Sequence, residues 1–123
     1  MLRRLLAVCV FTVLVTAAHA EVKATTTVYG PAAYTCSKWL SIRQSYGSQM
    51  DKISLSSWVG GYFSAINSYV ASAQKNVAKG ANLYDMESWV DGYCKTHPEE
   101  LVFNAVENLS EFLLGGGKIT PSK

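Results

Sequence analysis

The chain has 123 residues, with eleven Lys and Arg, nine Asp and Glu, two His and a formal net charge of +2 at pH 7. Arg3 and Arg4 account for this excess, so the rest of the chain carries nine basic and nine acidic residues, which argues against a nucleic-acid-binding surface. The length allows one domain with a modest core and is too short for two.

The first 20 residues have the three parts of a cleavable secretory signal peptide. Two arginines form the charged region, an apolar run extends from Leu5 to Val15, and Ala18-His19-Ala20 is a small-x-small cleavage site. The apolar run has eleven residues, well below the roughly 20 that cross a bilayer. The sequence therefore predicts export to a bacterial periplasm and a mature form with no membrane segment.

Residues 21–33 lack a clear hydrophobic period and are expected to form a flexible leader. From residue 35 apolar positions recur at helical spacing and predict a first helix to about residue 46, with Thr35 as its N-cap. The stripe of this helix consists of Cys36, Trp39, Leu40 and Arg43. Residues 46–52 are expected to connect it to the second helix.

A longer helix is predicted from residues 54–56 to Val77, because apolar residues fall on one stripe over this stretch. The stripe consists of Leu55, Val59, Tyr62, Phe63, Ile66, Tyr69, Val70, Ala73 and Val77. Lys79-Gly80-Ala81-Asn82 interrupts the pattern, and Asp85 is the expected N-cap of a short third helix that ends near Lys95. The third stripe consists of Met86, Trp89, Val90, Tyr93 and Cys94.

Thr96-His97-Pro98-Glu99 has the form of a capping box with proline in the first turn, which predicts a fourth helix from this point. Its apolar face consists of Leu101, Val102, Ala105, Val106, Leu109, Phe112 and Leu113. Gly115–Gly117 end the helix, and residues 116–123 are expected to be a flexible tail. The sequence thus predicts an all-α domain of four helices over residues 34–115.

Two cysteines remain after removal of residues 1–20, because Cys9 lies within that segment. An even pair in an oxidising compartment usually forms a disulfide, which predicts a Cys36–Cys94 bond between the start of the first helix and the end of the third. The alternative is a redox-active or nucleophilic Cys94 with His97 as its base. The chain has no Cys-x-x-Cys motif and no other histidine beyond residue 20, and both facts argue against this alternative.

A six-residue sequence occurs twice, as Ser-Trp-Val-Gly-Gly-Tyr at 57–62 and Ser-Trp-Val-Asp-Gly-Tyr at 88–93. The Trp and Tyr of each copy are four residues apart and share one face of a helix. Gly61 and Gly92 would let a neighbouring helix approach closely. Two interpretations remain open. The aromatic residues form either the packed core faces of two helices or a binding surface, since Trp and Tyr are frequent anchors at interfaces. These residues are Trp58, Tyr62, Trp89 and Tyr93.

Sequence motifs for catalysis or cofactor binding are missing, including His-Glu-x-x-His, Gly-x-Ser-x-Gly, Gly-x-Gly-x-x-Gly and the P-loop. His97 is interpreted as a first-turn helix residue, and a single histidine cannot build a metal site. Glu87 and Asp91 are interpreted as a solvated face turned away from Trp89. We therefore expect no enzyme, no catalytic residue, no metal and no cofactor. An enzyme would need Cys94 and His97, or these carboxylates, to converge in a cleft.

Three segments resemble the HdeA/HdeB-like group of small periplasmic helical proteins, namely Cys36–Leu40, Trp58–Phe63 and Cys94–Pro98. The resemblance covers roughly residues 34–113. It implies an acid-stress chaperone that opens or dissociates at low pH and shields unfolding proteins with its apolar surface. The residues that it carries over are Cys36 and Cys94 for the disulfide, and Trp58, Gly61, Tyr62 and Phe63 for the aromatic helix.

The charge balance suggests how acid would act on such a protein. Below about pH 4 the carboxylates lose their charge, nine bases remain uncompensated, and repulsion loosens the packing. The region from Trp89 to Leu113 also resembles the Rap1a/Tai-type immunity proteins, which neutralise secreted toxins in the periplasm. That resemblance implies a rigid, pH-insensitive binder of one enzyme. In both cases the expected partner is a protein, and a homodimer is a further option.

Overall fold

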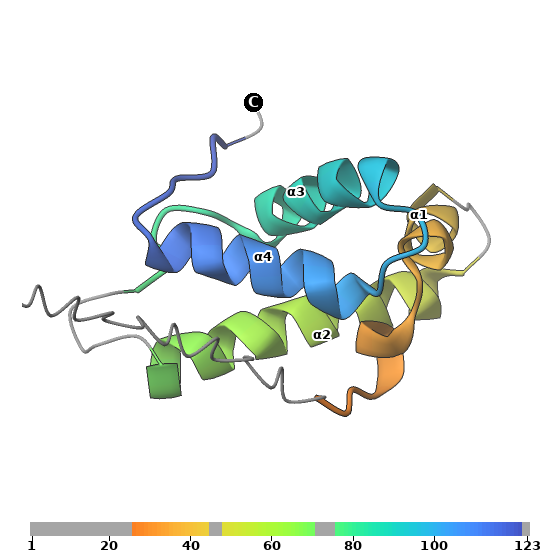
Figure 1. The fold of residues 1–123 in the computed structure, drawn as a ribbon, viewed down its shortest axis with the longest axis horizontal. Coiled ribbons are helices and arrows are strands. Elements are labelled where there is room, and N and C mark those ends of the chain that lie inside the picture. The colour runs from red at the N-terminus through yellow and green to blue at the C-terminus, as the bar shows by residue number, and fades with distance from the viewer. Residues whose placement is uncertain (1–25, 45–47, 71–75, 122–123) are drawn as a thin grey trace, which may run out of the picture.

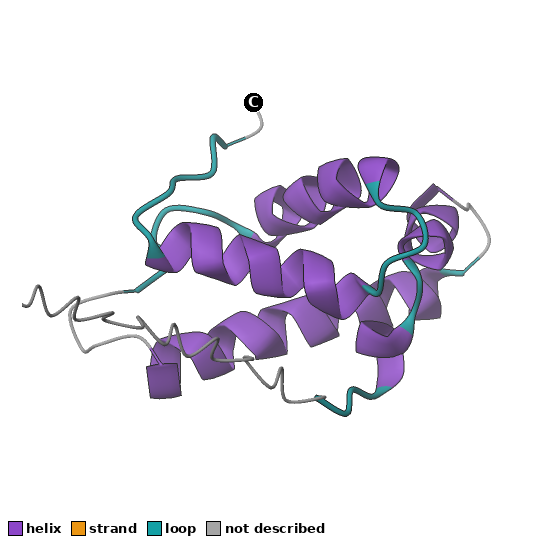
Figure 2. Ribbon diagram, in the orientation of Figure 1, coloured by secondary structure: helices purple, strands orange, loops and turns teal. Residues whose placement is uncertain are grey.

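The structure is a computed structural model that describes residues 26–44, 48–70 and 76–121. These residues form four α-helices and contain no strand, which confirms the predicted all-α fold (Figures 1 and 2). The helices are α1 at Cys36–Gln44, α2 at Gln49–Ala65, α3 at Leu83–Thr96 and α4 at Val102–Leu114. A 3₁₀-helix, η1, spans Gly30–Ala33, and a π-helix, η2, spans Ile66–Val70 directly after α2. The predicted signal peptide lies outside the described residues.

α2 begins and ends earlier than predicted. It begins at Gln49 because the Ser48 hydroxyl accepts a hydrogen bond from the Asp51 N–H at 3.3 Å and caps the first turn. The regular helix ends at Ala65, and the predicted end at Val77 is wrong. Asn67 Oδ1 accepts a hydrogen bond from the Val77 N–H at 3.0 Å, so Val77 lies beside η2 rather than at the end of a continuous helix. Residues 71–75 of the predicted helix lie outside the described residues.

The N-terminus of α3 is capped by Asn82, and the prediction of Asp85 as the cap is wrong. The Asn82 side chain accepts a hydrogen bond from the Asp85 N–H at 2.9 Å, while the Asp85 carboxylate accepts one from the Asn82 N–H at 3.3 Å. This reciprocal pair is a capping box in which Asp85 is the third residue of the helix.

α4 starts at Val102, so the predicted capping box at Thr96–Glu99 is also wrong. The Thr96 hydroxyl donates back to the Tyr93 carbonyl at 3.0 Å instead of capping forward, and the His97 N–H bonds the same carbonyl at 3.1 Å. These bonds complete the end of α3. A turn at residues 98–100 then leads into α4, which has no side-chain cap at Leu101.

The predicted disulfide is confirmed. Cys36 and Cys94 are both fully buried, with an S–S distance of 2.07 Å and a Cα–Cα distance of 4.7 Å. Backbone hydrogen bonds surround it, since the Cys36 N–H bonds the Glu100 carbonyl at 2.7 Å and the Val102 N–H bonds the Tyr34 carbonyl at 2.8 Å. The start of α1, the end of α3 and the start of α4 are therefore cross-linked at one end of the domain.

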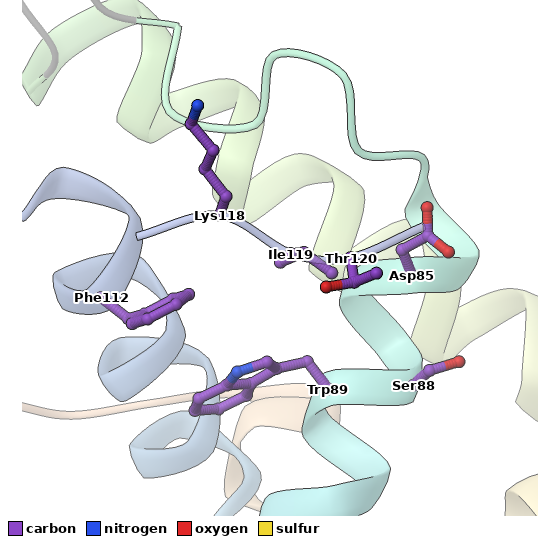
Figure 3. Close-up of a pocket in the computed structure, with 7 residues that line it drawn as sticks. All are labelled: Asp85, Ser88, Trp89, Phe112, Lys118, Ile119 and Thr120. Carbon is purple, nitrogen blue, oxygen red and sulfur yellow. The ribbon is translucent and has the colours of Figure 1, made fainter. Parts of the chain in front are cut away.

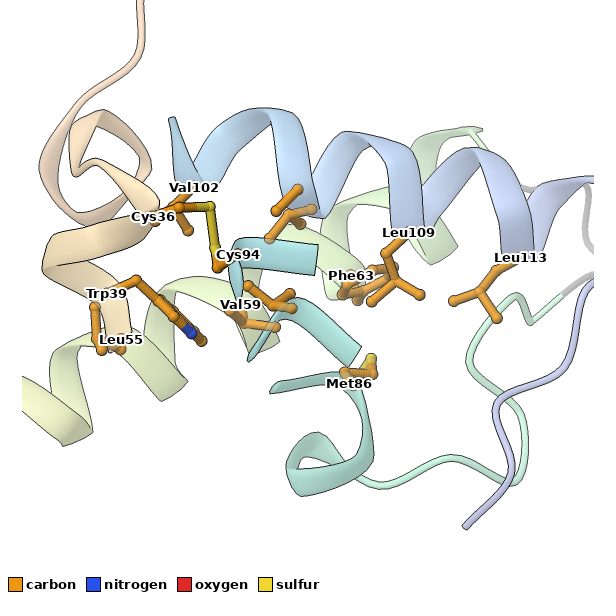
Figure 4. Packing of buried hydrophobic residues seen from close by; sticks show 13 residues of the cluster. Cys36, Trp39, Leu55, Val59, Phe63, Met86, Cys94, Val102, Leu109 and Leu113 are labelled. Carbon is orange, nitrogen blue, oxygen red and sulfur yellow. A yellow bond between two sulfur atoms is a disulfide. The ribbon is translucent and has the colours of Figure 1, made fainter. Parts of the chain in front are cut away.

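The hydrophobic core lies among the four helices, with α3 packed against α1, α2 and α4 (Figures 1 and 4). α4 meets α2 through side chains such as Tyr62 and Phe103. The members of the core are Cys36, Trp39, Leu55, Val59, Phe63, Met86, Val90, Cys94, Val102, Ala105, Val106, Leu109 and Leu113. Three residues predicted on apolar faces are exposed instead, namely Tyr69, Leu101 and Phe112. Tyr69 lies in η2, where the helical period changes, and Leu101 precedes the first turn of α4. Phe112 lies at the side of α4 rather than under it.

The two glycines of the repeated sequence do not lie in a close helix contact. A Cβ atom added at Gly61 or Gly92 would meet no other atom within 4 Å, so the prediction of close approach at these positions is wrong. A close contact occurs instead at Gly117, where an added Cβ would lie 2.5 Å from the Phe112 ring.

One residue in each of the predicted flexible segments packs on the domain. Ala32 of η1 is buried, and Ile119 is half-buried against the core. Beyond α4, the Gly117 N–H donates to the Phe112 carbonyl at 2.9 Å, and Gly116 has a φ of 91°, which favours glycine. Residues 118–120 thereby reach α3. No helix within the described ranges combines the length and the apolar character needed to cross a bilayer.

Candidate functional site

A cluster of charged groups lies where α1 packs against α3. Nη1 of Arg43 lies 2.6 Å from Oε2 of Glu87, and Nη2 lies 2.9 Å from Oδ2 of Asp91. Nε lies 2.7 Å from Oδ1 of Asp91, in ionic contact but without hydrogen-bond geometry. The Glu87 side chain is only 7% exposed and that of Arg43 19%. These ion pairs are therefore largely shielded from water.

Two uncharged side chains complete this cluster. The indole N–H of Trp39, a fully buried residue, donates to Oδ1 of Asp91 at 2.7 Å. The hydroxyl of Ser56, from α2, donates to Oε1 of Glu87. We call Trp39, Arg43, Ser56, Glu87 and Asp91 the Arg43 cluster. It joins α1, α2 and α3. The expectation that Glu87 and Asp91 form a solvated face is wrong, because α1 covers that face.

The pKa of Arg43 follows from these contacts. Burial lowers it, but the hydrogen bond with Asp91 and the negative charges of Asp91 and Glu87 outweigh burial and raise the pKa above the ordinary value. Arg43 therefore keeps its charge throughout the acid range, and the net charge of the cluster depends on its carboxylates. Lys95 and Gln44 line a shallow pocket beside Arg43 and Asp91, so a second positive charge lies nearby.

The first copy of the repeated sequence forms an aromatic cluster between α2 and α4. The Tyr62 ring lies 5.8 Å from the Trp58 ring, 5.5 Å from Phe63 and 6.4 Å from Phe103 of α4, measured between centroids. Trp58 and Tyr62 are half-buried, whereas Phe63 is buried in the core. Of the predicted binding residues in this copy, only Trp58 and Tyr62 therefore reach the surface.

The second copy forms a column of four rings between α3 and α4. Trp89 stacks on Tyr93 with a centroid distance of 5.8 Å, and Tyr93 stacks on His97 at 4.1 Å. Phe112 extends the column at 6.4 Å from Trp89. The interplanar angles are between 18° and 25°, and Phe112 is 43% exposed. The aromatic column thus runs along α3 and its C-cap and extends to Phe112 on α4.

An open pocket of about 350 Å³ adjoins the aromatic column (Figure 3). Trp89 and Phe112 form one side of it, and Ile119 and Thr120 from the C-terminal segment form the other. The C-terminal segment that was expected to be flexible therefore covers part of the column.

The two copies thus flank α4 on different sides, and each contributes to the core through its valine. Val59 and Val90 directly follow the two tryptophans and are fully buried, whereas the Trp and Tyr residues of both copies are half-buried. The aromatic pairs lie at the edge of the core and keep part of their surface exposed. They are therefore not fully buried core residues, and their role in binding a partner stays a prediction.

The Tyr93 hydroxyl belongs to a polar network at the end of the aromatic column. It donates to Oε2 of Glu100 at 2.7 Å, and Nδ2 of Asn108 lies 3.4 Å from its oxygen. The hydrogen bond to Glu100, with burial and the charge of Glu100, raises the pKa of Tyr93 from 10.0 to about 12.

This shift predicts a loss of stability in alkali. The pKa of Tyr93 is raised in the folded state. The contribution of its hydroxyl to the free energy of unfolding is therefore complete below pH 10 and disappears as the pH rises toward 12. In urea unfolding between pH 8 and pH 12, the free energy of unfolding should fall more steeply with pH for the wild type than for Tyr93→Phe. Tyr84→Phe, at an exposed tyrosine, is the control and should follow the wild type. Parallel curves for wild type and Tyr93→Phe would contradict the role of this hydroxyl.

The proposed nucleophile pair of Cys94 and His97 is not assembled. Cys94 has no free thiol because it is in the disulfide, and Nδ1 of His97 lies 3.0 Å from the Tyr93 carbonyl oxygen. Among the described residues, no group of three or more His, Cys, Asp or Glu could hold a metal ion. The chain has no significant match among protein-family models, curated proteins or solved structures.

Proposed function

We propose that this chain is a non-catalytic periplasmic protein, an HdeA-like acid-stress chaperone that binds unfolding proteins through apolar helix faces. The observation that carries the proposal is the Arg43 cluster, which joins three helices through two carboxylates and one permanently charged guanidinium. Such a cluster stabilises the closed domain only while its carboxylates are ionised.

Acid would act on this cluster in a defined direction. Loss of the negative charges of Glu87 and Asp91 in acid would leave the charge of Arg43 without its partners. Lys95, which lines a pocket together with Arg43 and Asp91, is also positive and gives no compensation. An unpaired buried charge costs about 3 to 5 kcal/mol, a large part of the stability of a small domain. The stabilisation is thus present at neutral pH and lost as the pH falls.

Loosening of the cluster would enlarge the apolar surface that the closed domain already shows. The packing of α1 on α3 covers Trp39 and Val90, and that of α2 on α3 covers Val59. Next to these residues lie the half-exposed rings of Trp58 and Trp89. Separation of the helices would join these rings to the freed core residues in patches of the size that bind other proteins.

The proposal is tested by comparing the oxidised protein with Glu87→Gln/Asp91→Asn, which imitates the protonated cluster. Dye binding to apolar surface and light scattering should change reversibly for the wild type between pH 7 and pH 2, with protection of an acid-unfolded client from aggregation. The double variant should bind dye already at pH 7. Glu99→Gln/Glu111→Gln, at exposed carboxylates, is the matched control. A wild type that stays compact and gives no protection at pH 2 would refute the chaperone function.

The aromatic column favours a second candidate, an immunity protein of the Rap1a/Tai type. Its rings from Trp89 to His97 stand on a helix anchored by the disulfide, and Phe112 offers an exposed aromatic anchor beside them. This function requires tight binding of one toxin at neutral pH. Loss of toxin capture in Trp89→Ala, with no acid-induced dye binding by the wild type, would favour it over the chaperone.

A further inference from the structure

The end of the domain opposite the disulfide contains a second kind of site. Residues 76–81, which precede α3, and the segment that follows α4 meet there (Figure 1). Between them lies an open pocket of about 600 Å³, a volume within the range of small-molecule sites. A smaller pocket of about 230 Å³ shares the same two lysines and continues to Ile119. The two pockets form one cleft, which we call the loop-end cleft.

The lining of the loop-end cleft is amphipathic. Val77, Leu113 and Leu114 provide apolar walls, and two exposed lysines, Lys79 and Lys118, also line the cleft. No Asp or Glu is among the described residues that line it. Lys118 also lines the pocket beside the aromatic column, and in Figure 3 its side chain points away from Trp89 and Phe112. The cleft therefore combines apolar walls with two positive charges.

Glycines keep the mouth of this cleft free of side chains. Gly80 has a φ of 89° and Gly116 one of 91°, and a Cβ atom added at either would meet nothing within 4 Å. Both glycines line the cleft. The backbone is thus accessible between the two lysines, and only the long, flexible lysine stems need to move when a ligand enters.

We propose that the loop-end cleft binds a small anionic amphiphile, namely a carboxylate that carries an apolar chain, such as a fatty acid. The chain would lie against Val77, Leu113 and Leu114, and the carboxylate would pair with Lys79 and Lys118. A neutral apolar molecule would leave the two charges unused, a cation would be repelled, and a bare anion would gain nothing from the apolar walls. This inference does not depend on the proposed chaperone function.

Calorimetric titration with three 12-carbon ligands at pH 7.5 tests the headgroup. Dodecanoate should bind the full oxidised protein below its micelle concentration, and dodecanol and dodecyltrimethylammonium should bind at least tenfold more weakly. At this pH the acid-driven opening plays no part, so a negative result leaves the chaperone proposal untouched. Equal binding of all three ligands, or no binding of dodecanoate, would overturn the proposed site.

Two pairs of lysine substitutions locate the site. Lys79→Gln/Lys118→Gln should weaken dodecanoate about tenfold, because two exposed ion pairs are lost. Lys52→Gln/Lys95→Gln removes the same charge elsewhere and should leave the affinity unchanged. Leu114→Asn should weaken dodecanoate and dodecanol alike. If the lysines only support the C-terminal end of α4, their replacement will lower the Tm without changing the affinity, and the proposal is then wrong.

Discussion

The variant Cys36→Ala/Cys94→Ala should unfold with a free energy about 4 kcal/mol lower than that of the oxidised protein. The bond closes a loop with a sequence separation of 58, and the chain-entropy model gives a stabilisation of about this size. Alanine is a better replacement than serine because both positions are fully buried, and a serine hydroxyl there would lose its hydrogen bonds to water. Urea unfolding at pH 7, monitored by circular dichroism, measures the difference.

Chemical reduction of the wild type is the control for this variant. The reduced protein should unfold at nearly the same urea concentration as the alanine variant, because both lack the same constraint. The variant should keep its helices in the absence of urea. A midpoint equal to that of the oxidised protein would show that the closed loop contributes nothing to stability.

Glu87→Gln should lower the free energy of unfolding at pH 7 by about 3 kcal/mol, the lower end of the range for buried pairs because Arg43 retains some exposure. Glutamine keeps the shape of the side chain but leaves Arg43 with one counter-charge instead of two. The loss should shrink in acid, because protonation of the wild-type carboxyl removes the same charge that glutamine lacks. Unfolding curves at pH 7, 5 and 3 test this dependence.

Two further variants make this prediction specific to the Arg43 cluster. Glu99→Gln, at an exposed carboxylate, should change the stability by less than about 0.5 kcal/mol. Arg43→Met/Glu87→Gln/Asp91→Asn should be more stable than Glu87→Gln/Asp91→Asn, since no unpaired guanidinium then remains near the core. A deficit of Glu87→Gln that is the same at pH 3 as at pH 7 would assign its effect to packing rather than to charge.

The four helices and the disulfide could be predicted because each depends on a pattern within a short segment or on chain composition. In α4, the apolar period identifies Val102, Val106 and Leu109, which are all buried in the structure. Only two cysteines, Cys36 and Cys94, follow residue 20, so each is the only possible disulfide partner of the other in that part of the sequence. The hydrophobic periodicity and the number of cysteines were sufficient to predict the fold class and the disulfide.

Helix boundaries were less predictable because several residues can cap the same turn. Asp85 and Asn82 both suit the start of α3, and the structure uses Asn82 as the cap and Asp85 as its reciprocal partner. Thr96 matches a capping box in sequence, but its hydroxyl bonds the preceding helix. Local sequence does not decide between such options, because the choice depends on the path of the chain between α3 and α4.

The Arg43 cluster was missed because an acidic pair four residues apart is usually a solvated helix face. Glu87 and Asp91 are shielded by a helix more than 40 residues earlier in the chain. One signal for the cluster was present. Arg43, the only arginine after residue 4, falls on the apolar stripe of α1, and an arginine on a core-facing stripe requires a buried counter-charge. The partners could not be identified without the packing of α1 on α3.

The position of α4 relative to the disulfide has a mechanical consequence. The covalent ring from Cys36 to Cys94 contains α1, α2 and α3, whereas α4 lies outside it. When the two chain ends are pulled apart, the tension passes through the disulfide bond. The three helices within the disulfide-closed loop then carry no load. The ring shortens the contour length of the stretched chain by about 200 Å. Among the described α-helices, force acts directly on α4 alone, so α4 should detach first while the ring stays closed.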